Sequence, residues 1–246
     1  MQILVISYGE SWEALASSSL IRRLHRQHDD MKLSWVTKPV SRCIFQYNNR
    51  IDELYDGETK LYQKFDLAIN LTPTDEAGDI LKSVDAEQKL GFLSSTEAVS
   101  QGAESVIDIL AGRKISKKHY FQLLYRVAEL AWRGDGYDLS YYPRNKMKKK
   151  KTGVAVTDPR LRTFVKNNLV LNYSAPWHVP MRHDLLKRVD EINRVKHIIT
   201  DDLFCAHAGI AMRKHVEFLD TNEFNMSIEF FGKGHHHVIK NDSWRI

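Results

Sequence analysis

The stretch QILVISYGESWEALASSSL, residues 2–20, decides the fold class of this chain. Its first six residues form a mainly apolar, β-branched run that is typical of a buried strand. Gly9 then permits a tight turn, and apolar residues recur every three to four positions as far as residue 28. A buried strand that leads through a glycine turn into an amphipathic helix predicts the first βα unit of a parallel sheet.

The same alternation of strand and helix patterns continues along the chain. In the first half we expect strands at 32–37, 51–56, 65–71 and 89–94, and helices near 43–47, 75–84 and 116–132. In the second half we expect strands at 153–156, 168–173, 195–200 and 215–220, and helices at 184–193 and 206–213. Asp75 and Ser116 are the predicted N-caps of their helices. The sequence therefore predicts an α/β protein with doubly wound parallel sheets.

A change of composition divides the chain near its middle. The run KMKKKK at 146–151 follows a segment without a helix or strand pattern, so it is typical of a solvated linker. We expect an N-terminal Rossmann-like domain at 1–145, a basic linker at 146–152 and a smaller C-terminal α/β domain at 153–246.

The bulk composition limits the class of protein. The 246 residues are 43% hydrophobic and 27% charged, as in soluble globular proteins. No apolar run approaches the roughly 20 residues that span a bilayer, and the first residues lack the features of a secretory signal. Cys43 and Cys205 are too few for a disulfide framework or a cysteine-built zinc site. These features predict a cytoplasmic protein.

The formal net charge of +5 favours anionic partners. The lysines at 114, 117, 118, 146 and 148–151 could steer an anionic acceptor, or hold the protein against an anionic membrane at the inner face. The alternative is that they form an ordinary solvated surface. No motif of a nucleic-acid-binding protein is present, so we expect no nucleic-acid partner.

The first candidate site follows the first strand. Gly9, Glu10 and Ser11 lead into the helix, whose first N–H groups can bind an anion, although neither a G-x-G-x-x-G nor a P-loop motif is present. Glu10 and Glu13 lie in or beside the first helical turn. They either complement the helix dipole, or Glu13 faces a cleft and serves as a general base.

The second candidate site follows the strand pattern HIIT at 197–200. Asp201 or Asp202 could cap the next helix, with His207 as a partly buried structural residue. The alternative is that a phosphate or ribose binds at the helix start, with His207 as a hydrogen-bond donor and an aspartate fixing the loop.

The histidine run at 235–237 has no accompanying cysteine or carboxylate at the spacing of a zinc site. Alternation along a strand would direct the middle histidine away from the other two. We therefore expect no metal site.

Taken together, the two candidate sites resemble the heptosyltransferase-type glycosyltransferases, glycosyltransferase family 9. The family segment L-G-x-x-G-D-x-L-x-x-x-P-x-x-x-x-L lies over residues 8–24 without a gap, and Glu13 falls where the family places its proposed catalytic aspartate. The family segment T-N/D-D-S/T-G-x-x-H-x-A lies over residues 200–208. The strand FDLAINL at 65–71 resembles the family's D-L-V-I-D-L. Trp12 stands where the family has glycine, and Leu203-Phe204 replace its small S/T-G pair.

The resemblance implies a two-domain GT-B architecture with a reduced C-terminal domain and metal-independent, inverting sugar transfer without a cofactor. The donor would be a nucleotide sugar, such as a nucleotide heptose, and the acceptor an anionic glycan or lipid-linked molecule, as in lipopolysaccharide biosynthesis. Glu13 would be the catalytic base. The donor side would comprise Thr200, Asp201, Asp202 and His207, and the acceptor side Gly9, Glu10 and Ser11. The alternative, favoured by Leu203-Phe204, is a non-catalytic GT-B-fold binding or scaffold protein that has lost donor use.

Overall fold

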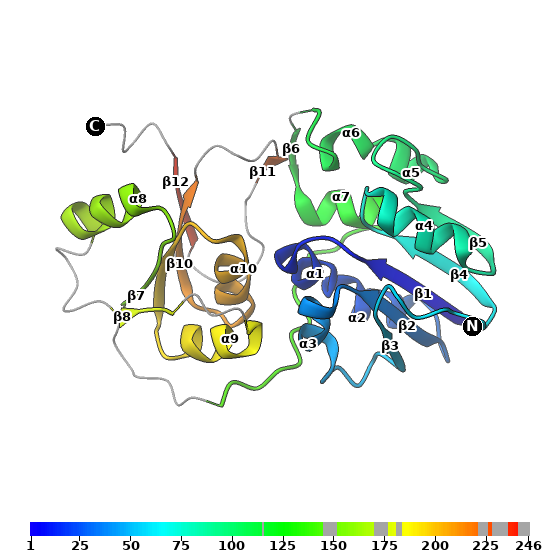
Figure 1. The fold of residues 1–246 in the computed structure, drawn as a ribbon, viewed down its shortest axis with the longest axis horizontal. Helices are drawn as coiled ribbons and strands as arrows, with labels where there is room; N and C mark the ends of the chain where they lie inside the picture. Colours follow the sequence, from blue (N-terminus) through cyan, green and yellow to red (C-terminus); the bar gives the residue numbers. More distant parts are fainter. Residues whose placement is uncertain are drawn as a thin grey trace. The chain divides into compact units, whose positions relative to one another are not determined.

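The structure is a computed structural model. It describes residues 1–114, 116–144, 152–169, 177–180, 184–220, 226–227 and 236–240. The chain divides into two compact units (Figure 1), Met1–Ser140 with Asn225–Ile228, and Tyr141–Phe224 with Glu229–Ile246, the second being the smaller. Along the chain, unit 1 first gives way to unit 2 between Ser140 and Tyr141. Of the expected linker at 146–152, all but the last residue lie outside the described residues.

Unit 1 contains a five-stranded parallel sheet of order β3-β2-β1-β4-β5. Its strands are β1 Gln2–Ser7, β2 Lys32–Thr37, β3 Glu53–Tyr55, β4 Phe65–Asn70 and β5 Ala86–Gly91. Strand β1 is central, and from Ile3 to Ile6 its side chains are fully buried because helices cover both faces of such a sheet. The strand order is the Rossmann order 3-2-1-4-5.

The helices of unit 1 connect these strands and pack on the sheet. They are α1 Ser11–Ser17, α2 Ser19–Gln27, η1 Pro39–Ser41, α3 Arg42–Phe45, α4 Asp75–Ser83, α5 Gln101–Glu104, α6 Ile107–Leu110 and α7 Tyr120–Val127. The short strand β6, Ser116–His119, pairs in parallel with β11, Met226–Ser227. Connections run from β1 toward β3 in one direction and from β4 to β5 in the other, so the topological switch point lies between β1 and β4.

The helix expected from residue 11 to 28 is broken at Ser18. The Ser18 hydroxyl donates to the Leu15 carbonyl at 2.6 Å and accepts from the Asp138 backbone N–H at 2.9 Å. Serine hydroxyls compete in this way for backbone groups, and the three consecutive serines at 17–19 provide such a point. The predicted helix therefore becomes α1 and α2.

The expected helix at 116–132 is also wrong at both ends. Residues 116–119 form β6, and α7 begins at Tyr120, where the His119 Nδ1 accepts from the Phe121 N–H at 3.3 Å. Pairing with a strand more than a hundred residues away overrides the local helix pattern. At α4 the N-cap is Thr74 rather than Asp75.

Unit 2 contains a second five-stranded parallel sheet, of order β12-β10-β9-β7-β8. Its strands are β7 Thr152–Ala155, β8 Trp177–His178, β9 His197–Thr200, β10 His215–Asp220 and β12 His236–Lys240. The helical segments are α8 Pro159–Phe164, the π-helical turn η2 Val165–Leu169, α9 Leu185–Asn193 and α10 Leu203–Ala211. In the numbering of this unit the strand order is 2-1-3-4-5, the flavodoxin-like order, with its switch point between β7 and β9.

The two parallel sheets confirm the expected α/β class with two Rossmann-like units. In unit 2, α10 begins three residues earlier than expected. The strand expected at 168–173 is wrong at residues 168 and 169, which belong to the π-helical turn η2, and residues 170–173 lie outside the described residues. Strands β8 and β12 of this unit, and β6 and β11 of unit 1, were not predicted. Among the helices that the structure describes, none is long and apolar enough to cross a membrane.

Candidate functional site

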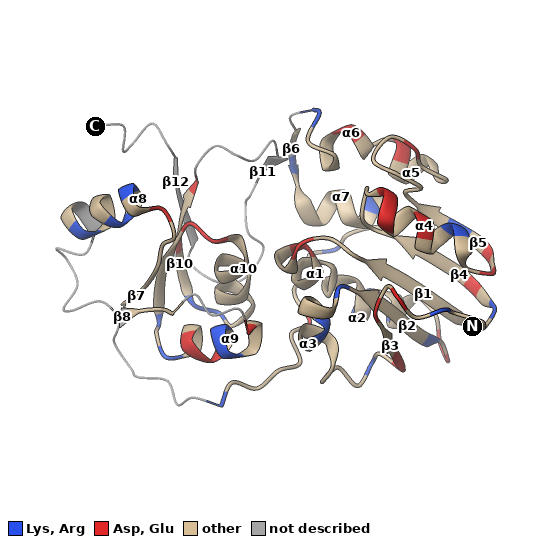
Figure 2. Cartoon of the chain, viewed as in Figure 1, with Lys and Arg blue, Asp and Glu red and all other residues tan. Residues whose placement is uncertain are grey.

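Both sequence-predicted sites lie at the switch points of their own sheets. In unit 1, the segment between β1 and α1 meets the end of β4, and the Tyr8 N–H donates to the Thr72 hydroxyl at 2.9 Å. In unit 2, the segment between β9 and α10 meets the end of β7. Each of these segments carries acidic residues (Figure 2). Ligands of open α/β sheets bind outside the carboxyl ends of the strands at such points.

Glu13 is held against the turn that precedes α1. Its Oε2 accepts from the Glu10 backbone N–H at 2.6 Å, the geometry of a capping box. Its Oε1 lies 3.4 Å from the Tyr120 hydroxyl, which donates to it from the first residue of α7. The Tyr120 ring is buried, and the Trp12 ring packs on it with the centroids 4.8 Å apart.

Burial raises the pKa of Glu13 above its ordinary value of 4.5, and the negative charge of Glu10 raises it further. The Glu10 N–H, the Tyr120 hydroxyl and the charge of Lys38 oppose this shift. A carboxylate with a raised pKa is a stronger base than an ordinary one. Burial and the charge of Glu13 together raise the pKa of Tyr120 well above its usual range, so this phenol stays a proton donor.

Gly9 is the residue that makes room for the Glu13 carboxylate. A Cβ atom at position 9 would lie 2.1 Å from Glu13 Oε2. The atom it would meet is the end of a flexible side chain, so the carboxylate can move while the backbone stays in place. The glycine expected from the sequence to permit a tight turn thus also fixes where the carboxylate lies.

Gly9→Ala is expected to lower strongly the rate of any reaction in which Glu13 acts as the base, while leaving thermal stability almost unchanged. The added methyl group displaces the Glu13 carboxylate, and a misplacement of about 1 Å can cost about a hundredfold in rate. The measurement is turnover together with a melting curve. Gly136→Ala is the matched control, because no atom lies within 4 Å of a Cβ at that position. A melting temperature that falls in step with turnover would contradict this local explanation.

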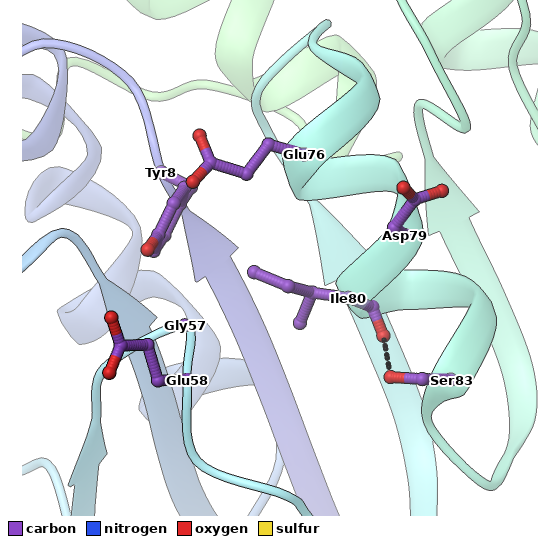
Figure 3. Close-up of a pocket in the computed structure, with 7 residues that line it drawn as sticks. All are labelled: Tyr8, Gly57, Glu58, Glu76, Asp79, Ile80 and Ser83. Atoms are coloured by element: carbon purple, nitrogen blue, oxygen red, sulfur yellow. Dashed lines mark hydrogen bonds between the residues drawn. The ribbon is translucent and has the colours of Figure 1, made fainter.

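An acidic cavity of about 340 Å³ opens near the ends of β1 and β3 and along α4 (Figure 3). It is lined by Tyr8, Gly57, Glu58, Glu76, Asp79, Ile80 and Ser83. Burial raises the pKa of Tyr8, and the charges of Glu76 and Glu58 add to this effect. The carboxylates favour hydroxyl or amino groups of a ligand and disfavour anionic groups.

In unit 2, Asp201 joins the two strands at the switch point. Its carboxylate accepts from the Thr157 N–H at 2.8 and 2.9 Å, from the Thr157 hydroxyl at 2.8 Å and from the Asp158 N–H at 2.9 Å. Thr200 is fully buried, and its hydroxyl donates to the Ala155 carbonyl at 2.7 Å. Both side chains therefore shape the loop in this structure.

Asp202 is the N-cap of α10, which confirms the capping interpretation for this residue. Its Oδ1 accepts from the Cys205 N–H at 2.7 Å. Its Oδ2 also lies 3.4 Å from Nη1 of Arg188, a residue of α9 whose side chain is only 13% exposed. The Arg188 guanidinium lies 5.6 Å from the centre of the Phe204 ring. A helix N-terminus with an adjacent guanidinium is a favourable place for a phosphate group.

The remaining side chains of this segment are inside the unit. His207 is buried on α10 at 3% exposure, and Leu203 and Phe204 are also buried. Leu203 and Phe204 thus belong to the core of unit 2, so their size does not by itself decide whether a ligand can reach the helix start. Their effect on donor binding stays a prediction.

Two residues of these sites were not predicted from the sequence. Arg188 lies 14 residues before Asp202 on another helix, and Tyr120 lies 107 residues after Glu13. No local spacing connects either pair. A search for a cation on a helix that precedes the acidic pair could have suggested Arg188, whereas Tyr120 had no comparable signal.

The fold and the two switch-point segments define a class of two-unit α/β proteins, and several solved structures share this fold. The glycosyl transferase family 9 from Veillonella parvula DSM 2008 is 13% identical with a TM-score of 0.61, over 98% of this chain and 86% of that one. The E. coli heptosyltransferase WaaC with ADP-2-deoxy-2-fluoro heptose is 10% identical with a TM-score of 0.65, over 97% and 93%. The E. coli ADP-heptose lps heptosyltransferase II is 12% identical with a TM-score of 0.60, over 97% and 90%.

No family model and no curated protein matches the sequence. The structural similarity nevertheless covers nearly all of this chain. It confirms that the chain has the fold of family 9 glycosyltransferases and heptosyltransferases, as the resemblance of the two segments implied.

Proposed function

We propose that this protein is a glycosyltransferase that moves a sugar from a nucleotide-sugar donor to a hydroxyl group of a glycan or lipid-linked acceptor. The observation that carries the proposal is Glu13, a carboxylate of raised pKa in the first turn of the helix that follows the central strand, in a fold shared with heptosyltransferases. Glu13 takes the proton of the acceptor hydroxyl, the oxygen attacks the anomeric carbon, and the nucleoside diphosphate leaves. This displacement inverts the anomeric centre, and we propose that it needs no metal ion.

The donor side is proposed to be the start of α10. The N–H groups of its first turn and the Arg188 guanidinium would bind the donor diphosphate. Solved structures of the same fold contain ADP or an ADP-sugar, which supports a nucleotide-sugar donor. Asp201, Asp202 and Thr200 would fix the geometry of the loop. His207, which is buried on α10, would serve the donor side as a hydrogen-bond donor.

The acceptor side is proposed to be the segment of Gly9, Glu10 and Ser11 with the acidic cavity beside it. Hydroxyl groups of the acceptor would enter this cavity. Any phosphate or carboxylate of an anionic acceptor, or of a membrane surface, would instead be attracted by the lysines at 114, 117 and 118.

Among a panel of nucleotide sugars, at least one is expected to raise the melting temperature of the full chain. A donor present at a hundred times its Kd adds about 2.7 kcal/mol to the free energy of unfolding. The matching free sugar and an uncharged nucleoside are the controls, because both lack the diphosphate. No stabilisation by any member of the panel would contradict donor use.

The second candidate function is a non-catalytic binding or scaffold protein of the same fold. The sequence at Leu203 and Phe204 favours it, because the family segment has a small S/T-G pair at these positions, although both side chains lie in the core of unit 2. The two functions differ in one measurement: a binding protein stabilised by a nucleotide sugar would release no nucleoside diphosphate from it in the presence of any acceptor.

A further inference from the structure

A cluster of two histidines and a glutamate lies at the amino-terminal ends of two inner strands of the second sheet. His197 is the first residue of β9, and His215 and Glu217 lie at the start of β10. One ligand atom of each of these three side chains lies within 4.8 Å of the others. The proposed donor side is at the carboxyl ends of the same strands, so the cluster is separate from it.

The register of the sheet explains why the three side chains meet. His197 pairs with His215 in the parallel ladder, and Glu217 is two residues further along β10. Paired residues and residues two apart share one face of a sheet. The same register pairs His237 of β12 with Glu217, which places a further histidine at the adjacent position in the sheet.

The distances within the cluster approach those of a metal site. His197 Nε2 lies 3.1 Å from Glu217 Oε1. Ligand atoms bound at about 2.0–2.1 Å to a tetrahedral zinc ion lie about 3.3 Å from one another. The separation of this pair is close to that value. The exposed His215 ring has its centre 4.6 Å from that of His197, and a ligand atom of His215 lies within 4.8 Å of those of the other two residues.

The surroundings also suit a metal ligand. His197 Nδ1 lies 3.3 Å from the Thr152 hydroxyl on the neighbouring strand β7. Metal-binding histidines usually use their second ring nitrogen for a hydrogen bond of this kind, which orients the ring. The side chains of His197 and Glu217 are 11% and 15% exposed, whereas His215 faces solvent and leaves a path for an ion and a water molecule.

We propose that His197, His215 and Glu217 bind a divalent transition-metal ion, for which Zn²⁺ is the best match. Two imidazoles, a carboxylate and a water molecule form a ligand set that Zn²⁺ accepts in tetrahedral geometry. The ion would connect β9 to β10 and would take no part in sugar transfer. The sequence did not indicate this site because His197 lies on another strand, and the pair His215 and Glu217, two residues apart on β10, is too small a signal without it.

The test uses the full chain, purified without an affinity tag and stripped of metal with a chelator. Zn²⁺ is titrated into it by calorimetry, and Co²⁺ serves as a spectroscopic probe of ligand geometry. We expect one Zn²⁺ per chain, a Co²⁺ absorption band of the tetrahedral type, and a melting temperature that rises with Zn²⁺ and falls again with chelator.

The variants His215→Ala and Glu217→Gln are expected to weaken this binding by at least ten- to a hundredfold, the loss that follows even from removing a residue behind a metal ligand. His178→Ala is the control. It removes an exposed histidine of the same sheet on β8, three strands and about 14 Å from β10.

Two outcomes would overturn the proposal. One is the absence of stoichiometric binding. The other is binding that survives in both His215→Ala and Glu217→Gln but is lost when the histidines at 235–237 are replaced by alanine, since the histidine run alone would then hold the ion. Melting curves of the metal-free variants show whether each still folds.

Discussion

Glu13→Gln is expected to reduce turnover by about a hundred- to ten-thousandfold, the usual contribution of a general base. Glutamine keeps the shape of the side chain and can still accept from the Glu10 N–H, but it cannot take a proton. Donor affinity is expected to stay the same, because the donor side is proposed on unit 2. The measurements are steady-state turnover and donor binding by calorimetry.

Glu104→Gln is the matched control, since it neutralises an exposed glutamate of unit 1 on α5. It should leave turnover unchanged. If Glu13→Gln retained full turnover, Glu13 would not be the base.

Glu13→Gln should also change how turnover and thermal stability depend on pH. With wild-type protein, turnover falls as the pH falls through the raised pKa of Glu13, above the ordinary value of 4.5. The folded state binds this proton more tightly than the unfolded state does. The protonated Glu13 therefore adds to the stability of the folded state at low pH, and this contribution is lost as the pH rises through the pKa of Glu13 in the folded state. Above that pKa, the Glu13→Gln protein should melt at the same or a higher temperature than the wild type.

Arg188→Met is expected to weaken donor binding by about ten- to a hundredfold. A hydrogen bond from a charged group to a phosphate contributes about 1.5–3 kcal/mol, which corresponds to that range. Methionine keeps much of the apolar contact with Phe204 but has no charge. The measurement is the Kd of the nucleotide sugar that stabilises the wild type most.

Arg194→Met provides the comparison on the same helix. Arg194 follows α9 and forms an ion pair with Glu191 three residues earlier. Both variants lose an ion pair, so both should lose some thermal stability. Equal donor affinity in the two variants would show that Arg188 only supports the fold.

The sequence predicts some strands exactly, but it places β5 three residues too late and misses β6, β8, β11 and β12. The strands at 2–7, 32–37 and 215–220 were predicted with their exact limits, because continuous or alternating apolar residues mark the part of each strand that is buried in the sheet. The limits of α1, α2 and α7 were missed because distant residues determine them. Asp138 binds the serine at the break between α1 and α2, and β11 pairs with the segment expected to begin α7.

In the candidate sites too, residues near a strand end could be predicted from the sequence, whereas residues brought together by the tertiary fold could not. Gly9, Glu13 and Asp202 were found because each lies within a few residues of a strand end, where motif spacing is preserved. Tyr120, Arg188 and the three residues of the proposed metal site required the tertiary fold. The acidic cavity was also missed, since its carboxylates come from two segments, each of which has the pattern of an ordinary solvated surface.

The short strand β11 has a consequence for synthesis on the ribosome. Residues 225–228 belong to unit 1, although its other residues end at Ser140. At about 5–20 residues per second, the partner of β6 is made about 4–17 s after the rest of that unit. During this interval β6 lacks its partner, and an unpaired strand edge is a site of aggregation. A nascent chain of this protein would therefore benefit from a chaperone until residues 225–228 emerge.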